Sequence, residues 1–456
     1  MPDPTTVAPR ELPRRIGFWG ASAVMVGIII GSGIFAAPTA IAGQMGSPWM
    51  ILATWLAGGV LSLFGALTYS ELATMYPQSG GVYVFMREGF GRPVAFVFGW
   101  TYMLITKPAA AAGIAVVFGQ HVNSLLGTGW DAKWVTTVIL VVLTGVNVRG
   151  VRLGTGVAGV FTFVKVAAII AIIALGVVLL KGSAANLKDQ PAPLDVRTGL
   201  PIPVLMALTP VMFKVMWTYD GWSDVGAIAG EVKDPQRELP KIYLAGTVAV
   251  TILYVAVNAV YLYMMPLSEM AGVDTVAPVV MRRLLGPAGG IAVTVLILVS
   301  TLGSTHGSIL TGARVTYAQA RDGLLFRFLG RVHPRYETPA VALWSQLALS
   351  ITALWLLKGF AEMADAFVFT MWIFYGLAAA AIFVFRARRP DAPRPYRCWG
   401  YPVIPALFIL AAIVMTAMSI YQDPRHTLPW LGLLAAGVPV YYVWNRFWPP
   451  PAPAGE

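Results

Sequence analysis

Long apolar runs, separated by short polar or charged stretches, follow one another along the whole chain. They predict twelve helices, at residues 16–42, 48–75, 90–124, 133–148, 153–180, 203–230, 238–265, 287–320, 338–358, 363–386, 402–422 and 427–446. Most of these runs reach or exceed the ~20 residues that a helix needs to cross a bilayer. Alternation of apolar and polar residues with the period of a strand is absent, which argues against an outer-membrane barrel. The chain is therefore predicted to be an all-α membrane protein with twelve transmembrane helices.

The first predicted helix is interrupted at its own midpoint. Residues 26–40 read VGIIIGSGIFAAPTA, with Gly31, Ser32 and Gly33 inside the apolar run. Glycine weakens a helix, and a break that faces lipid would leave backbone N–H and C=O groups without partners. A break is tolerated where it lines a cavity, so this one predicts a cavity inside the membrane. The alternative is close helix–helix packing, for which small residues are equally suited.

The sixth predicted helix carries a second interruption, in the polar stretch TYDGWSD at residues 218–224. Helices 1 and 6 are the first members of two groups of five, and paired interruptions at corresponding positions are typical of a transporter binding site. Because five is odd, the second group enters the membrane from the opposite side, which predicts a 5+5 inverted-repeat fold. The expected divisions are an N-terminal segment (1–15), the first repeat (16–200), the second repeat (201–388), the last two helices (389–448) and a disordered tail (449–456).

The two breaks together predict a site for a zwitterion. The N-terminal end of the outer half of helix 1 carries a partial positive charge, so a carboxylate would lie on the N–H groups of Ser32, Gly33 and Ile34. The ends of the preceding half-helices carry partial negative charge. The ammonium group would therefore meet carbonyl oxygens near Ile30 and near residues 217–218.

Composition and charge agree with a membrane protein. Of the 456 residues, 57% are hydrophobic and 12% are charged, whereas a soluble protein has about 25% charged residues. With the N-terminus in the cytoplasm, the inner segments hold 20 of the 32 Lys and Arg residues and the outer segments hold 8. This bias predicts that both termini are cytoplasmic. The net charge of +11 is thus a sign of topology, and the bilayer rather than nucleic acid is the expected surrounding. With one cysteine, Cys398, and no Cys/His cluster, neither a metal nor a cofactor is expected.

The GSGIF stretch at residues 31–35 resembles the first helix of the amino acid–polyamine–organocation superfamily. Other stretches narrow the resemblance to its L-type (LAT-like) amino acid transporters. They include GALTYSELATMYPQSGGVYVFMREGFG (65–91), TYDGWSDVGAIAGEVKDPQRELPKIYLAG (218–246) and RPDAPRPYRCWGYPVIPALFILAA (389–412). These stretches occur in the order of the family and cover almost the whole chain. The resemblance implies a twelve-helix fold with broken helices 1 and 6, and sodium-independent amino acid transport by alternating access.

The resemblance also implies roles for individual residues. Gly31, Ser32 and Gly33 would receive the backbone of the substrate. Trp217 would be the aromatic residue that closes over the substrate. The unwound part of helix 6 would consist of Thr218, Asp220 and Gly221.

Lys165 lies inside the fifth predicted helix, where a charge is costly and usually functional. The family resemblance implies that its ammonium group lies between helices 1 and 8, where sodium-coupled relatives hold an ion. A tethered charge would then replace sodium. Two alternatives remain at this stage: a lysine that loads and releases a proton, and a lysine that extends to the inner surface.

Roles are expected for three further charged residues within predicted helices. Lys107 precedes Pro108, and local support of a kink is its expected role. Lys214 is expected either to face an outer vestibule or to pair with Asp220. Asp220 is expected to cap the inner half of helix 6, with direct contact to a ligand ammonium as the alternative.

The sequence therefore predicts a transporter of neutral amino acids in the plasma membrane of a bacterium, working as an exchanger or a proton-coupled symporter. Transport of cationic amino acids or polyamines is the alternative if Asp220 faces the site. An enzyme is a remote alternative, because neither a Ser-His-Asp arrangement nor an HExxH motif or phosphate loop is present and no catalytic residue is expected. Animal L-type transporters join a glycoprotein through an outer cysteine between helices 3 and 4. Residues 120–134 contain none, so a disulfide-linked heavy-chain partner is not expected.

Overall fold

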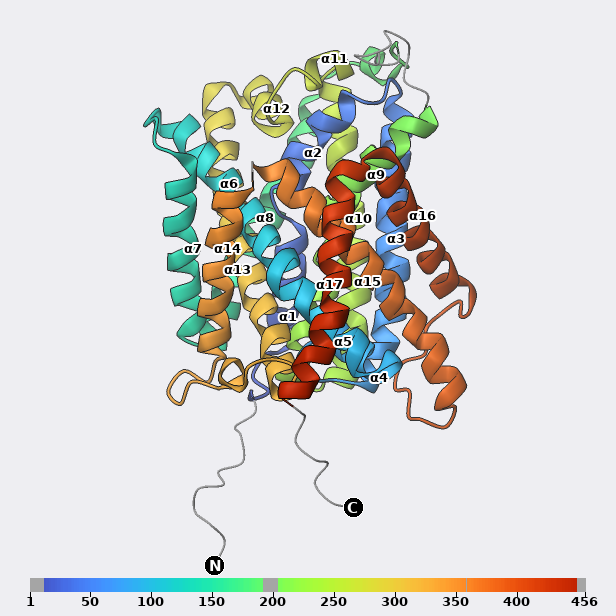
Figure 1. Ribbon diagram of the computed structural model, residues 1–456. Helices are drawn as coiled ribbons and strands as arrows, with labels where there is room; N and C mark the ends of the chain where they lie inside the picture. The colour runs from blue at the N-terminus through green and yellow to red at the C-terminus, as the bar shows by residue number, and fades with distance from the viewer. Residues whose placement is uncertain (1–11, 192–203, 358, 449–456) are drawn as a thin grey trace, which may run out of the picture.

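The computed structural model describes residues 12–191, 204–357 and 359–448, and none of these residues belongs to a β-strand (Figure 1). Nine helical segments of the described residues are long and apolar enough to cross a membrane, and two shorter apolar helices accompany them. An interrupted segment, residues 204–231, completes the twelve predicted spans. The predicted fold class, an all-α membrane protein with broken helices 1 and 6, is confirmed.

The spans are formed by the following elements: α1 (Phe18–Ile29) with α2 (Gly33–Ala42), α3 (Pro48–Met75), α5 (Arg92–Thr101) continuing through the π-helix η1 (Tyr102–Thr106) into α6 (Lys107–Leu126), α7 (Ala132–Val148), α8 (Val151–Leu179), α9 (Val204–Tyr219) with the 3₁₀-helix η3 (Trp222–Glu231), α10 (Pro235–Met264), α13 (Pro287–Arg321), α14 (Ala340–Leu356), α15 (Phe360–Arg388), α16 (Val403–Gln422) and α17 (Pro424–Phe447). Short connecting helices are α4 (Val82–Phe90), η2 (Ala184–Leu187), α11 (Leu267–Met270), α12 (Val276–Leu285) and η4 (Arg327–Gly330).

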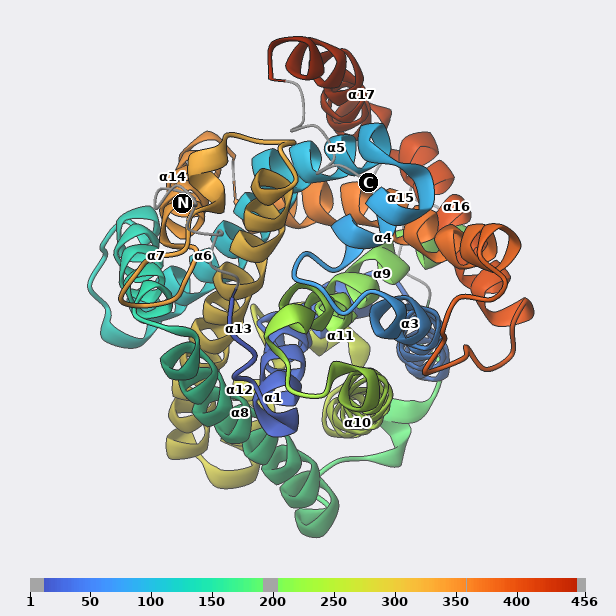
Figure 2. The same ribbon diagram turned by 90° about the horizontal axis from the view of Figure 1, so that it is seen from below.

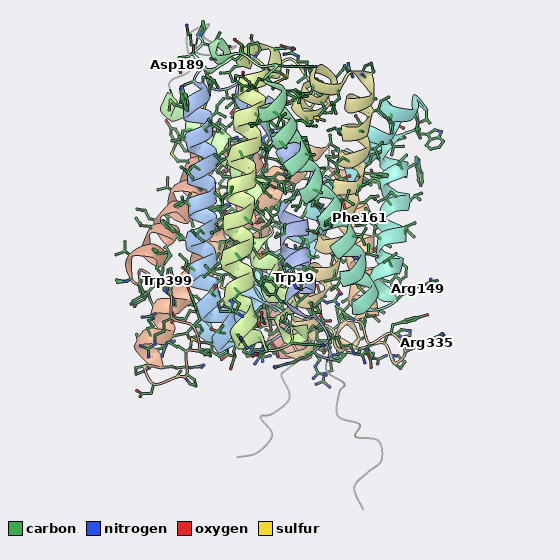
Figure 3. All side chains as sticks on the ribbon, turned by 180° about the vertical axis from the view of Figure 1, so that it is seen from behind. Trp19, Arg149, Phe161, Asp189, Arg335 and Trp399 are labelled. Atoms are coloured by element: carbon green, nitrogen blue, oxygen red, sulfur yellow. The ribbon has the colours of Figure 1, made fainter. Side chains whose placement is uncertain are left out.

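Different elements lie at the two ends of the helix bundle. The beginning of α1, the end of α17 and helix α4 lie at one end, which we call the inner end, while α11 and α12 lie at the opposite, outer end (Figure 1). Figure 3 shows Arg149 and Arg335 toward the inner end and Asp189 at the outer end. The broken helix α1–α2 begins at the inner end, and α9–η3 begins at the outer end. The two interrupted spans therefore run in opposite directions.

The broken helices lie in the middle of the bundle, and the last two helices lie at its edge (Figure 2). In the most apolar window of α1–α2, 78% of the residues are buried, compared with 22% in α16 and 17% in α17. Exposed side chains on the sides of the bundle are largely apolar, and Trp19, which is 80% exposed, is visible in Figure 3. This distribution is the one expected when lipid surrounds the bundle and the breaks are shielded from lipid.

The inner ends of the two broken helices are joined by backbone hydrogen bonds. The N–H of Ile16 donates to the carbonyl of Glu231 at 2.9 Å, and the N–H of Lys233 donates to the carbonyl of Ile16 at 2.8 Å. The Glu231 side chain forms an ion pair with Arg314 of α13 at 2.8 Å, and both side chains are fully buried. These contacts hold α1, η3 and α13 together below the breaks.

The buried ion pair yields a prediction about stability. Replacing one partner leaves an uncompensated buried charge, so Arg314→Met should lower the free energy of unfolding by about 3–5 kcal/mol. The double variant Arg314→Met, Glu231→Leu should lose clearly less, because neither charge remains. Denaturation in mixed micelles measures the free energy of unfolding of the single and the double variant. The control is Arg237→Met, because the Arg237 side chain is 73% exposed. It should change stability by less than about 0.5 kcal/mol. Equal losses in the single and double variants would contradict this account of the pair.

Candidate substrate site

Both interruptions fall where glycine and polar residues enter the apolar runs. Helix α1 ends at Ile29, and the chain resumes as α2 at Gly33. Helix α9 ends at Tyr219, and η3 begins at Trp222. The break between α9 and η3 contains Gly221, whose φ of 114° is a conformation that residues with a side chain rarely adopt.

The two breaks lie against each other through these glycines. A Cβ atom on Gly33 would lie 3.1 Å from the Cα of Thr218 and 2.8 Å from its Oγ1. A Cβ atom on Gly221 would lie 2.6 Å from the Cγ2 of Ile28. Each break therefore needs a glycine to allow the close approach of the other.

The N-terminal end of α2 has unpaired N–H groups. Among the hydrogen bonds of the described residues, none uses the N–H of Ser32, Gly33 or Ile34, whereas Phe35 and Ala36 both donate to the carbonyl of Ser32. Ser32 is 2% exposed, and its hydroxyl also has no partner among the described residues. Buried polar groups are normally hydrogen-bonded, so this end of α2 is suited to an anion.

The opposite half of the break, the C-terminal end of α1, is held by Lys165 of α8. The Lys165 ammonium group donates to the carbonyls of Gly27 and Ile30, both at 2.7 Å. It also donates to the carbonyl of Ser300 and the hydroxyl of Ser304 on α13, both at 3.0 Å. The side chain is fully buried, so it does not extend to the inner surface. The Lys165 side chain thus lies at the negative end of α1, between α1, α8 and α13, which are the predicted helices 1, 5 and 8.

Tyr254 of α10 links the two breaks from a third side. Its hydroxyl lies 2.7 Å from the carbonyl of Ile29 and 3.3 Å from that of Thr218. This residue was not predicted from the sequence, since a tyrosine within an apolar helix has no local feature that reveals its hydrogen-bond partner.

A cavity opens at the meeting point of the breaks. Trp217 and Phe367 both line the cavity, and their rings pack edge to face with 5.3 Å between the ring centroids. Ser308 of α13 also lines the cavity, and its buried hydroxyl has no partner among the described residues. The wall is completed by Ile28, Ile29, Gly31, Ser32, Gly33, Lys107, Ala110, Ile114, Thr218, Asp220 and Asp224.

The charged side chains of the cavity are arranged differently from the expectation. Lys107 forms a buried ion pair with Asp224 at 2.7 Å, so its role extends beyond support of a local kink. Asp220 does not cap η3: Gly221 occupies the cap position without a side-chain bond, and Asp220 accepts a hydrogen bond from the Tyr375 hydroxyl at 2.6 Å. The capping prediction was wrong because a tertiary partner on α15 competes with the local backbone.

The predicted site residues separate into three groups. Those that line the cavity are Gly31, Ser32, Gly33, Trp217, Thr218 and Asp220. Ile30, Ile34 and Gly221 lie beside it without lining it, and the Ile30 carbonyl is already bound by Lys165. Lys214 lies elsewhere, in a second cavity near the outer end, and not beside Asp220. Within the described residues, no cluster of three His, Cys, Asp or Glu side chains is suited to a metal ion.

Known proteins resemble this chain over nearly all its length. It is 33% identical to the cystine/glutamate transporter of Homo sapiens, over 96% of this chain and 87% of that protein. It is 31% identical to the serine/threonine exchanger SteT of Bacillus subtilis (strain 168), over 94% of this chain and 97% of that protein. It is 30% identical to the b(0,+)-type amino acid transporter 1 of Mus musculus, over 92% of this chain and 85% of that protein. The family model described as amino acid permease matches residues 16–440, so the chain belongs to the amino acid permease family, as the resemblance of its motifs predicted.

Proposed function

We propose that this chain moves neutral amino acids across the bacterial inner membrane by alternating access, independently of sodium. The observation that carries the proposal is the row of unpaired N–H groups at residues 32–34, beside the central cavity that Thr218 and Asp220 also line. The named relatives are transporters or exchangers of amino acids and not enzymes, which supports transport as the activity.

Two helix ends would bind the two charges of the substrate. The carboxylate would accept hydrogen bonds from the N-terminal end of α2. The ammonium group would lie at the C-terminal end of α9, near the Thr218 carbonyl, because the C-terminal end of α1 is already occupied by Lys165. Close approach to the backbone is allowed by Gly31 and Gly33.

Lys165 would act as a fixed cation in place of sodium. Hydrogen bonds from a charged donor contribute about 1.5–3 kcal/mol each, and the three N–H groups of this ammonium are shared among four nearby acceptors. They connect α8 and α13 to the C-terminal end of α1. Opening the inner half of the transporter would therefore require α1 to move with these helices or to release Lys165.

The charge of the cavity favours neutral side chains on the substrate. Lys107 and Asp224 neutralise each other as a buried pair. Asp220 is the remaining charged group, and its hydrogen bond from Tyr375 occupies one of its oxygens. Cationic amino acids or polyamines are the alternative substrates, because a carboxylate at the cavity wall also suits a second ammonium group.

The arrangement in the membrane follows from charge and from the connecting segments. The described ends of the chain lie at the inner end, together with the arginine-rich segments (Figure 1). This supports a cytoplasmic location for both termini. The segment between α6 and α7 lacks the cysteine that a disulfide-linked heavy chain would need, which supports a stand-alone transporter.

Transport in proteoliposomes tests the function and the role of Lys165. Purified protein in sodium-free vesicles loaded with unlabelled amino acid should take up labelled alanine, serine or leucine. Lys165→Met should lower this uptake at least tenfold, because the Gly27 and Ile30 carbonyls at the end of α1 lose this donor. Lys133→Met, at the beginning of α7 and outside the central cavity, is the matched control and should retain uptake. A strict sodium requirement of the wild type would contradict the proposal. Uptake that needs internal amino acid indicates exchange, and uptake driven by a proton gradient into empty vesicles indicates symport.

A competition panel tests the selectivity. Neutral amino acids should compete with the labelled substrate, while arginine, putrescine and glutamate should not. Asp224→Asn leaves Lys107 uncompensated and should improve competition by glutamate severalfold. If the substrates are neutral amino acids, Asp220→Asn should change their competition with the labelled substrate by less than about twofold. Strong arginine or putrescine competition in the wild type, abolished by Asp220→Asn, would instead establish the cationic alternative.

A further inference from the structure

A second cavity is present at the outer end of the bundle. It lies between α9, α15 and the turn that connects α16 to α17, and the central site uses none of its residues. Lys214 of α9, Asp365 of α15, and Asp423 and His426 at the turn contribute its ionisable groups. Asp423 and His426 are exposed at the rim, and Lys214 is half-buried.

Two of these four groups lack a close partner. Among the described residues, the Lys214 ammonium group has one hydrogen bond, a long one of 3.5 Å to the carbonyl of Pro210, and no ion pair. Asp365 faces the same cavity and interacts electrostatically with Lys214, but no ion pair or hydrogen bond of its carboxylate is found within the described residues. Lys214 is half-buried and Asp365 is exposed, so a ligand can reach both charges. A partly buried charge without a close partner is costly, so Lys214 in particular would gain from a partner outside the chain.

The other two ionisable groups satisfy each other. The Asp423 carboxylate lies 2.7 Å from the Nδ1 of His426, and it also accepts from the backbone N–H of His426 at the beginning of α17. The cavity therefore offers one available cation and one available anion, without direct contact between them. Its remaining wall is partly apolar and includes Phe213 and Trp430.

We propose that this cavity is an outer binding site for a zwitterion, with the anionic group on Lys214 and the ammonium group on Asp365. The ligand is a free amino acid that enters from outside, and this identification rests on the proposed function. The apolar wall would accommodate its side chain.

The position of the site couples it to the central cavity. Lys214 lies one turn before Thr218 on α9 and three residues before Trp217. Asp365 lies two residues before Phe367 on α15. A zwitterion that bridges Lys214 and Asp365 would fix the spacing of the two helices that carry the aromatic pair. The outer site would thus hold the incoming amino acid before Trp217 and Phe367 separate.

Binding stoichiometry tests the proposal in the full chain. Purified protein in phosphatidylcholine nanodiscs is titrated with labelled L-alanine and, separately, L-leucine by equilibrium dialysis. We expect two molecules per chain for the wild type, and one for Lys214→Met and for Asp365→Asn. Lys133→Met and Asp274→Asn remove the same charges elsewhere on the outer side and should still bind two. Gly33→Val, which fills the central site, should retain one molecule, and that molecule should be lost when Lys214→Met is added.

A phosphatidylethanolamine headgroup also carries an ammonium group beside an anion. A second experiment distinguishes a bound lipid headgroup from a bound free amino acid. Nanodiscs that contain this lipid are used to count lipid retained per chain. Lipid retention that falls with Lys214→Met and Asp365→Asn, together with loss of the second amino acid, would assign the site to the headgroup. A single bound amino acid in both membranes, unaffected by these variants and without a change in retained lipid, would overturn the outer site while leaving the proposed function intact. Binding of no amino acid at all would instead refute the proposed function.

Discussion

Peptide groups inside a bilayer must find partners, and the arrangement at the centre of this protein follows from that constraint. The break between α1 and α2 and the break between α9 and η3 create four helix ends near one another. The C-terminal end of α1 is satisfied by Lys165 and two serines of α13, and Tyr254 contributes to both breaks. The N-terminal end of α2 is left without partners beside a cavity. A zwitterion bound at this end of α2 would therefore meet both unpaired N–H groups and an open cavity.

The same organisation connects the site with movement. Below the breaks, α1 and η3 are joined by the Ile16 hydrogen bonds, and η3 is attached to α13 by the Arg314–Glu231 pair. Above the breaks, Trp217 and Phe367 lie over the cavity on α9 and α15. The proposed substrate site therefore lies between an inner group of tied half-helices and an outer pair of aromatic side chains, an arrangement that suits the alternating access we propose.

Features with a local signal could be predicted from the sequence. The spans follow from apolar length, and both breaks follow from glycine and polar residues inside apolar runs. Lys165 could be singled out because a charge within a helix needs a partner. The partners themselves depend on tertiary contacts: Asp220 bonds to Tyr375 rather than to the helix end, and Lys107 finds Asp224 on another helix. The 3₁₀ form of η3 and the π-helix η1 were not predicted either, since helical periodicity does not distinguish these forms.

Amino acid binding by two glycine variants tests the central claim most directly. Gly33 touches Thr218 at the meeting point of the breaks, whereas a Cβ atom on Gly159 of α8 would meet no other atom within 4 Å. With purified protein and labelled alanine, serine or leucine, Gly33→Val should abolish the binding that depends on the central cavity, and Gly159→Val should bind like the wild type. Equal, wild-type binding by both variants at that cavity would contradict the account that a substrate is held between the two broken helices.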